Sequence, residues 1–281
     1  MKVAVTGGTG FIGNYVVQEL LRHEIAVLVT GTNLEKAKSF PWFEKVAFCE
    51  LNLGENRNEK DSEKNEIAIK AIADCQKLIH LVWAGLPNYK SLFHFEENLM
   101  PQYFFLQKVI ESGVKDLTIT GTCFEYGMKN GALSPTLPAD PQNPYALAKD
   151  TLRKFLEQLQ TQNPFQLKWM RLFYMYGKGQ SEKSILSQLA KAIENGETTF
   201  NMSGGAQLRD YLPVETVAEK LVEKALDNDA NGVFNVCSGV PISIRELVEQ
   251  YLRENDKKIA LHLGYYPYPD YEPMAFWGEN T

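Results

Sequence analysis

The sequence lacks a long apolar run and any excess of positive charge. Its 281 residues contain no stretch of about 18 consecutive apolar residues, so we expect no transmembrane helix. The formal net charge is −6, and no basic cluster indicates binding to nucleic acid or to a membrane surface. Met1 and Lys2 lead directly into an apolar segment, so we expect no signal peptide.

The cysteines are few and scattered. The four of them, none in a Cys-x-x-Cys pair, are Cys49, Cys75, Cys123 and Cys237. This spacing predicts neither a metal site nor a disulfide framework, and it is typical of the reducing cytoplasm. Hydrophobic residues make up 44% and charged residues 23%, the balance of a globular protein with room for one large or two modest domains.

The start of the chain does contain a distinctive pattern. Residues 3–5 are predicted to form a short buried strand, Gly7, Gly10 and Gly13 follow at intervals of three, and residues 15–21 have the apolar spacing of a helix. Glycines let the backbone turn tightly and approach a pyrophosphate, and the helix N-terminus offers unpaired N–H groups to that anion. A strand, a glycine turn and a helix in this order predict a dinucleotide-binding unit.

Strands and helices alternate through the first half of the chain. This alternation predicts an α/β fold with a doubly wound parallel sheet, covered by helices on both faces. The polar segment 54–65 is predicted to be a loop. Further strands are expected at residues 26–30, 45–49, 77–82, 116–120 and 167–173, and helices at 66–73, 99–112 and 144–159.

The second half is less regular. We expect helices at 183–195, 214–226 and 244–253, a strand at 233–236, and an irregular tail at 265–271, which is rich in tyrosine and proline. We interpret residues 1–167 with about 206–237 as the dinucleotide-binding domain. Residues of about 168–205 and 238–281 would form a smaller substrate lobe over the carboxyl ends of the strands.

The segment after the second strand bears on the choice of cofactor. An acidic residue there favours NAD, and an arginine favours NADP. Directly after the strand at 26–30 there is neither an acidic residue nor an arginine, and Glu35 lies too far along, in the next helix. Because Thr32, Asn33 and Lys36 can hold a 2′-phosphate that no acid repels, the segment favours NADP(H), with NAD(H) as the alternative.

Tyr145 and Lys149 form a candidate acid–base pair. Residues four apart share one face of a helix, and an ammonium beneath a phenol lowers its pKa toward the working range. Tyr145 would then be a usable general acid or base. Thr122, just after the strand at 116–120, lies at the ligand-binding edge and can hydrogen-bond a substrate oxygen.

With these motifs in this order, the chain resembles the extended short-chain dehydrogenase/reductases, in particular their nucleotide-sugar epimerase, dehydratase and reductase group. The resemblance covers essentially the whole chain and implies Thr122, Tyr145 and Lys149 as catalytic residues. It also implies a set of cofactor-binding residues: Gly7, Gly10, Phe11, Ile12, Gly13, Thr32, Asn33, Asn52, Leu53, Leu81, Ala84, Asn98, Tyr145, Lys149 and Phe173. The substrate-binding residues that it implies are Thr122, Cys123, Phe124, Tyr174 and Arg209, with Arg209 holding the diphosphate.

Departures from the group's pattern narrow the chemistry. Cys123 and Phe124 stand where dehydratases of the group carry Asp-Glu, so elimination of water is not expected. Cys123 is also one position away from the cysteine of 3,5-epimerases, and we interpret it as a packing residue. Tyr174 stands where an asparagine often contacts the diphosphate. The strings at 122–127, 200–205 and 270–278 resemble reductases of dTDP-4-keto-6-deoxyhexoses.

The sequence therefore predicts a cytoplasmic NAD(P)-dependent 4-ketoreductase of a nucleotide sugar. One alternative is a 4-epimerase that uses the same motifs, and another is a non-catalytic cofactor-sensing regulator. We expect no metal. The helices at 99–112 and 144–159 carry apolar residues on more than one face, including Tyr103, Phe104, Phe105 and Phe155, and we expect one face to cover the sheet and the other to form a homodimer contact. His80 is expected in the core, His23 and His94 in solvent, and a surface pair of Arg209 with Asp210 is the alternative to phosphate binding.

Overall fold

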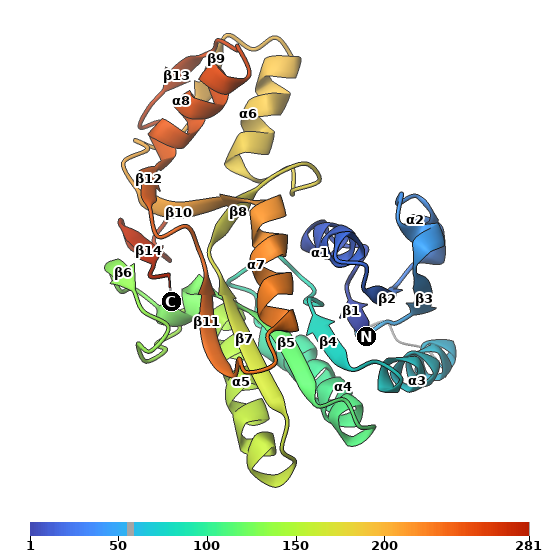
Figure 1. The fold of residues 1–281 in the computed structure, drawn as a ribbon. Coiled ribbons are helices and arrows are strands. Elements are labelled where there is room, and N and C mark those ends of the chain that lie inside the picture. The colour runs from blue at the N-terminus through green and yellow to red at the C-terminus, as the bar shows by residue number, and fades with distance from the viewer. Residues whose placement is uncertain (55–58, 281) are drawn as a thin grey trace.

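A parallel seven-stranded sheet forms the centre of the molecule. The structure is a computed structural model that describes residues 1–54 and 59–280 (Figure 1). The strand order is β11-β7-β5-β4-β1-β2-β3, and every neighbouring pair is parallel. The predicted doubly wound α/β fold is confirmed. The strands are β1 (Lys2–Thr6), β2 (Ala26–Gly31), β3 (Ala47–Glu50), β4 (Lys77–His80), β5 (Asp116–Thr122), β7 (Gln166–Leu172) and β11 (Gly232–Val236).

Helices cover both faces of this sheet because its strands are apolar on both sides. In β1, Val3 and Val5 face one core and Ala4 faces the other. The first core packs against α1 (Phe11–Arg22) and α7 (Val214–Leu226). The second packs against α3 (Glu59–Ala73), α4 (Leu99–Glu111) and α5 (Pro144–Gln162). A short α2 (Leu34–Lys38) and a 3-10 turn, η1 (Phe43–Lys45), lie between β2 and β3.

The predicted loop over residues 54–65 is wrong from Glu59 onward, where α3 begins. The segment is polar, but its Glu and Lys residues are good helix formers. Its continuation buries Ala68 and Ile72 against the sheet, and Lys64 pairs with Glu50 at the end of β3. Residues 55–58 of that predicted loop lie outside the described residues.

The carboxyl edge of the sheet carries a smaller unit (Figure 1). Its own core lies between α6 (Ile185–Glu194) and α8 (Ile244–Glu254). Three short sheets belong to this edge: β8 (Tyr174–Tyr176) with β10 (Leu208–Pro213) and β12 (Pro241–Ser243), β9 (Thr199–Asn201) with β13 (Ala260–His262), and β6 (Gly131–Leu133) with β14 (Phe276–Gly278).

The chain passes more than once between the two units. The domain boundary predicted at residues 167 and 168 falls inside β7, which belongs to the large sheet, and β10 within the segment 206–237 pairs with the small strands instead. The segments α7 and β11 pack against and pair with the large sheet.

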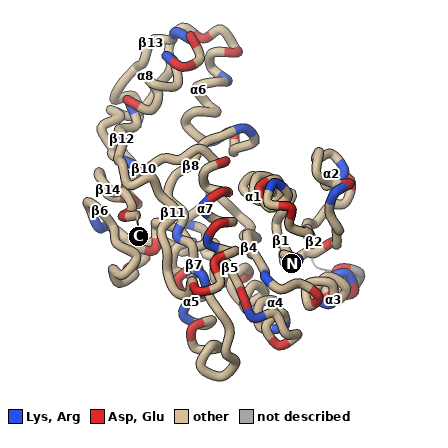
Figure 2. Tube along the Cα trace, viewed as in Figure 1, with Lys and Arg blue, Asp and Glu red and all other residues tan. Residues whose placement is uncertain are grey.

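Acidic and basic residues are interspersed along the outer helices, and no face of single charge is visible in Figure 2. Among residues 1–54 and 59–280, no helix has the length and apolar character needed to cross a bilayer. Within the same residues, the structure contains no cluster of three or more metal-ligating His, Cys, Asp or Glu side chains.

Candidate active site

The glycine turn between β1 and α1 has the geometry of an anion cradle. Gly7 has a φ of +76°, a conformation that favours glycine. A Cβ on Gly13 would lie 2.1 Å from the Gly7 carbonyl oxygen, so this position needs glycine for packing alone. Gly10 precedes Phe11 and Ile12 and caps α1 without a side-chain hydrogen bond, which leaves the N–H groups of the first helical turn for a pyrophosphate. The cradle therefore fits a dinucleotide.

The segments after β2 and β3 form the other end of the predicted cofactor site. Asn33 accepts a hydrogen bond from the Lys36 backbone at 2.9 Å and caps α2, so its side-chain oxygen is already in use. Thr32 precedes it in an exposed turn. Asn65 binds the backbone N–H and carbonyl of Asn52 at 2.8 and 2.7 Å, which fixes the segment that holds Asn52 and buried Leu53.

Lys149 is buried and contacts the backbone of β5. It lies on α5, which starts at Pro144 with Asn143 as its cap. Its Nζ donates to the carbonyl oxygen of Thr120 at 2.7 Å and lies 4.2 Å from the centre of the Trp83 ring. Burial lowers the pKa of Lys149 to about 7. The residue can therefore exchange a proton near neutral pH.

Tyr145 lies one turn before Lys149 and is 7% exposed. The prediction that Lys149 lowers the pKa of Tyr145 is wrong. Burial raises the pKa of Tyr145, and a hydrogen bond from Thr122 opposes this only in part. The reason is that Lys149 directs its ammonium to Thr120 and itself loses charge on burial. The phenol is protonated at neutral pH, as a general acid must be.

Thr122 ends β5 and caps the 3-10 turn η3 (Cys123–Tyr126). Its Oγ1 accepts from the Phe124 backbone at 3.3 Å, while the Glu125 carboxylate accepts from the Thr122 backbone at 2.9 Å. Because Thr122 Oγ1 is the acceptor of this bond, its own hydroxyl proton remains available for donation to a ligand or to Tyr145. The capping role and the predicted catalytic role are compatible.

Glu125, which the sequence reasoning missed, anchors this turn. It is completely buried and pairs with Arg171 Nε at 2.7 Å, with Trp169 Nε1 at 3.0 Å as a further donor. Its place three residues after a cap Thr is the capping-box signal that could have revealed it.

Cys123 and Phe124 belong to this turn, and their side chains are buried. Burial raises the pKa of the Cys123 thiol, which favours the uncharged form and agrees with its interpretation as a packing residue. The Phe124 ring packs edge-on against Tyr89 at 5.0 Å and Tyr174 at 6.2 Å.

Asn98 ends a one-turn π-helix, η2 (His94–Asn98), before α4. Its Nδ2 donates to the carbonyl oxygen of Ala84 at 3.2 Å, and its Oδ1 accepts from Gln102 at 3.3 Å. Gln102 in turn bonds His80 at 2.9 Å, and His80 bonds Thr6 at 2.7 Å. The expectation that His80 is a satisfied core residue is confirmed, and the chain of bonds fixes Asn98 near Leu81 and Ala84.

His94 was expected in solvent, and this expectation is wrong. The residue is fully buried, and its ring centre lies 5.2 Å from that of Tyr145. Trp83 Nε1 donates to its Nδ1 at 3.1 Å, and its Nε2 donates to the Asn88 carbonyl at 2.9 Å. A polar residue at the start of a predicted helix gives no indication in the sequence that it is buried.

A cavity of about 430 Å³ opens beside these groups. Its inner end is lined by Phe173 and Tyr89, whose ring centre lies 5.6 Å from that of Tyr145. Further wall residues come from β8, β10, the start of α6 and the tail, and they include Tyr174, Arg209 and Glu272. Of the predicted substrate-binding residues, Tyr174 and Arg209 line the cavity, whereas Thr122, Cys123 and Phe124 are not among its lining residues.

Arg209 is buried in the wall of this cavity. Its Nη2 lies 3.0 Å from Oε1 of Glu272, and its Nη1 donates to the carbonyl oxygens of Leu208 and Met274 at 2.8 and 3.2 Å. Tyr174 also donates to Glu272. The alternative surface pair with Asp210 is wrong, because Asp210 is buried and accepts from the backbone of Ser238 and Gly239.

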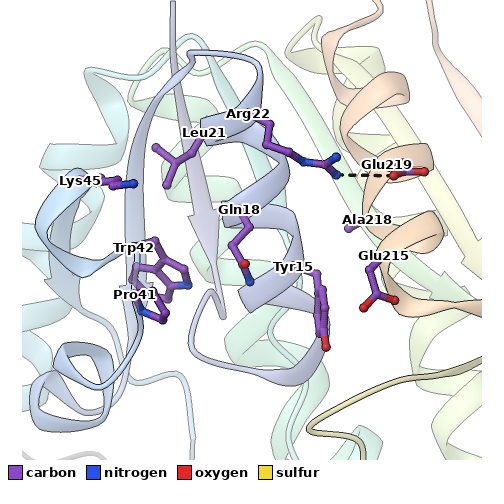
Figure 3. Close-up of a pocket in the computed structure, with 10 residues that line it drawn as sticks. All are labelled: Tyr15, Gln18, Leu21, Arg22, Pro41, Trp42, Lys45, Glu215, Ala218 and Glu219. Atoms are coloured by element: carbon purple, nitrogen blue, oxygen red, sulfur yellow. Dashed lines mark hydrogen bonds and ion pairs between the residues drawn. The ribbon is translucent and has the colours of Figure 1, made fainter.

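A second cavity of about 590 Å³ lies between α1 and α7, away from these residues (Figure 3). Tyr15 and Gln18 line one side, Glu215 and Glu219 line the other, and Arg22 reaches Glu219 at 3.5 Å. None of the predicted site residues lines it.

The comparisons with known proteins agree with this geometry. Residues 3–237 match the model of the NAD dependent epimerase/dehydratase family. The chain belongs to this family. The dTDP-6-deoxy-L-talose 4-dehydrogenase (NAD(+)) of Aggregatibacter actinomycetemcomitans is 32% identical over 282 residues, which cover 99% of each chain.

Solved structures of epimerases share the fold. The UDP-N-acetylglucosamine 4-epimerase from Methanobrevibacter ruminantium, in complex with UDP-N-acetylmuramic acid, superposes with a TM-score of 0.84 at 21% identity, covering 100% of this chain and 89% of that one. The UDP-glucose 4-epimerase of Thermus thermophilus, in complex with NAD, gives 0.79 at 23% identity, covering 98% and 90%. The family resemblance and the assignment to an NAD-dependent enzyme class are confirmed.

Proposed function

We propose that this enzyme is a 4-ketoreductase of a nucleotide sugar, of the class of dTDP-4-keto-6-deoxyhexoses. The observation that carries the proposal is the position of Tyr145, one turn before Lys149 on α5, with its ring centre 5.6 Å from that of Tyr89 in the wall of the 430 Å³ cavity. Reduction of a ketone needs a proton donor at this place. The 32% identical relative, whose name is a dTDP-6-deoxy-L-talose 4-dehydrogenase, supports the substrate class.

Thr122, Tyr145 and Lys149 have different roles in the protonation of the C4 oxygen of the sugar. Thr122 donates a hydrogen bond to this oxygen, and Tyr145 gives it a proton. Lys149, whose pKa is lowered to about 7, restores charge balance near the phenol and holds the ribose of the cofactor. Bound nicotinamide dinucleotide supplies the hydride. Gly7, Gly10 and the start of α1 hold its pyrophosphate.

For the cofactor we favour NAD(H) over NADP(H), against the preference taken from the sequence. The family is described as NAD-dependent, and the 32% identical relative is named as an NAD(+) enzyme. Initial rates with each cofactor test this choice. A tenfold or larger preference for NADPH would reverse it.

The decisive experiment is a turnover assay with a panel of nucleotide sugars that includes a dTDP-4-keto-6-deoxyhexose. A ketoreductase consumes one NAD(P)H per sugar reduced, whereas a 4-epimerase interconverts sugars without net consumption. A cofactor-sensing regulator binds the dinucleotide but turns over no sugar. The Tyr145→Phe variant is the control for activity that arises from a contaminant.

The exposed aromatic face of α4 and α5 supports a homodimer. Phe104 and Phe155 are 53% and 37% exposed, and the rings of Tyr103 and Phe155 lie 5.5 Å apart. Phe105 lies on the other face of α4, in the core, and stacks on His80. The dimer contact that we propose is made by α4 and α5 of two copies across a two-fold axis.

A further inference from the structure

The Lys149 ammonium lies against the face of an indole ring. Its Nζ is 4.2 Å from the centre of the Trp83 ring, and Lys149 is 2% exposed. A cation over an aromatic face is attracted by the quadrupole of the ring, and this attraction is strongest where water is excluded. Burial disfavours the charged form of Lys149, and the Glu125 carboxylate favours it through space. The Trp83 face therefore adds to the forces that keep this buried ammonium charged and in place.

The Trp83 ring is itself fixed by His94. Nε1 of Trp83 donates to Nδ1 of His94 at 3.1 Å, and the two rings are stacked with their centres 6.4 Å apart. A ring nitrogen that accepts a hydrogen bond carries no proton, so the proton of His94 is on Nε2, which donates to the Asn88 carbonyl at 2.9 Å. Burial lowers the pKa of His94, and the charge of Lys149 acts in the same direction. His94 therefore stays neutral, which is the form that can hold the indole.

The segment that binds His94 also holds Tyr145. The backbone N–H of Tyr145 is in the first turn of α5, where N–H groups have no partner within the helix, and it donates to the carbonyl oxygen of Tyr89 at 3.2 Å. The ring centre of Tyr145 lies 6.2 Å from that of Trp83 and 5.2 Å from that of His94. Trp83 thus contacts both Lys149 and Tyr145, and His94 connects it to the segment that binds the start of α5.

We propose that Trp83 is a positioning residue for the Tyr145–Lys149 pair, in which its ring face holds the ammonium and its bond to His94 fixes the ring. This inference rests on the proposed function, in which Tyr145 and Lys149 act at the C4 oxygen. Without the indole, the ammonium loses a favourable partner in a dry site, and a larger fraction of Lys149 is neutral at a given pH. Fewer molecules then carry the charge that balances the Tyr145 phenolate formed on proton transfer.

Carbon-13 NMR of the whole protein with labelled lysine tests this role without any substrate. The Lys149 signal, identified as the one absent from Lys149→Met, reports the protonation of Nζ as the pH is varied. We expect Trp83→Leu to move the Lys149 midpoint downward by about 0.5–1 pH unit, the size of a cation–π contact at a desolvated site. Trp83→Phe keeps an aromatic face and should shift the midpoint less. Trp277→Leu is the matched control, because Trp277 is also partly buried but lies on β14.

His94 is tested by the same titration. In His94→Asn the amide oxygen can replace Nδ1 as the acceptor of the Trp83 N–H, whereas the side chain of His94→Leu cannot accept. We expect His94→Leu to lower the Lys149 midpoint and His94→Asn to lower it less. If Trp83→Leu does not fold, Trp83→Met takes its place, because Met adapts to irregular space and also lacks a ring.

A kinetic measurement connects the contact to the reaction. Because the pKa of Lys149 is about 7, the expected shift predicts that kcat of Trp83→Leu falls about two- to fivefold at pH 7 and by less at pH 6. The KM for the sugar should change less than kcat. A purely structural effect would lower kcat equally at both pH values, and that result would overturn the positioning role.

The NMR outcomes separate this inference from the proposed function. An equal Lys149 midpoint in wild type and Trp83→Leu would overturn the role of Trp83 and leave the ketoreductase function standing. Equal shifts in Trp83→Leu and Trp277→Leu would also overturn it, because the effect would then come from a general loosening of the fold. A wild type that shows the expected titration but reduces no nucleotide sugar would overturn the proposed function, and the positioning role with it.

Discussion

The ammonium of Lys149 donates to the carbonyl oxygen of Thr120 at 2.7 Å. Burial lowers the pKa of Lys149 from its ordinary 10.5 to about 7. Between these values the unfolded chain holds a proton that the folded chain has released. Folding stability from this group therefore rises with pH across that window.

This linkage gives a prediction for Lys149→Met. Wild-type stability should gain up to about 1.4 kcal/mol per pH unit from this residue between pH 7 and 10, and the variant should lack that gain. Urea unfolding of both proteins at pH 7, 8 and 9 measures the difference between them. A difference that stays constant with pH would show that Lys149 keeps its charge on folding.

Tyr145→Phe keeps the ring and its contacts with Tyr89 and His94 but removes the proton. We expect kcat to fall by about 10²–10⁴, the usual contribution of a positioned acid. Steady-state rates at saturating sugar measure this, and titration with NADH should give an unchanged affinity. Nearly normal turnover would exclude Tyr145 as the proton donor.

Gly10→Val and Gly13→Val should separate binding from folding. A Cβ on Gly10 meets a single atom within 4 Å, the Gly7 carbonyl oxygen at 3.1 Å, so Gly10→Val should fold and lose NADH binding because its side chain fills the pyrophosphate position. A Cβ on Gly13 would overlap the Gly7 carbonyl oxygen at 2.1 Å, so Gly13→Val should be destabilised outright. Thermal shift with and without NADH distinguishes the two. NADH protection of Gly10→Val would place the pyrophosphate elsewhere.

The sequence predicts the large sheet well because its strands and helices are set by local apolar patterns. It also predicts the Tyr145 and Lys149 pair, since two residues four apart on one helix need no tertiary information. The pKa direction at Tyr145 could not be predicted, because burial depends on Trp83, Tyr89 and His94 from elsewhere in the chain.

The same limit applies to the cavity wall. Glu272 and Arg209 lie 63 residues apart in sequence, and their contact depends on how the tail crosses β10. The first turns of the helix from Glu59 were missed for another reason, since Glu63, Lys64 and Glu66 are exposed and a polar segment of this kind resembles a loop.

The proposed dimer predicts that Phe104→Glu yields a monomer. Phe104 is 53% exposed, so the charge should be tolerated by the isolated subunit and costly only in an apolar contact. Light scattering at micromolar concentration should give twice the mass for wild type as for the variant. Met128→Glu is the control, because Met128 is also an exposed apolar residue. Phe93→Glu is unsuitable, because the Phe93 ring packs against His94. A monomeric wild type would contradict the dimer.

The last prediction concerns Glu272. If its carboxylate cancels the charge of Arg209, then Glu272→Gln should leave Arg209 with an unbalanced positive charge while keeping a side chain of the same shape. Gln can still accept from Tyr174 and Arg209, so the tail should stay in place. We expect dTDP to bind several-fold more tightly to Glu272→Gln than to wild type, with a steeper loss of affinity as salt rises. Thymidine affinity should not change, because the change acts on phosphate charge. Calorimetry at two salt concentrations makes the measurement, and Asp270→Asn is the matched control, since Asp270 pairs with exposed Lys90 at the outer side of the tail. Unchanged or weaker dTDP binding in Glu272→Gln would show that the Glu272 carboxylate does not oppose phosphate binding at Arg209.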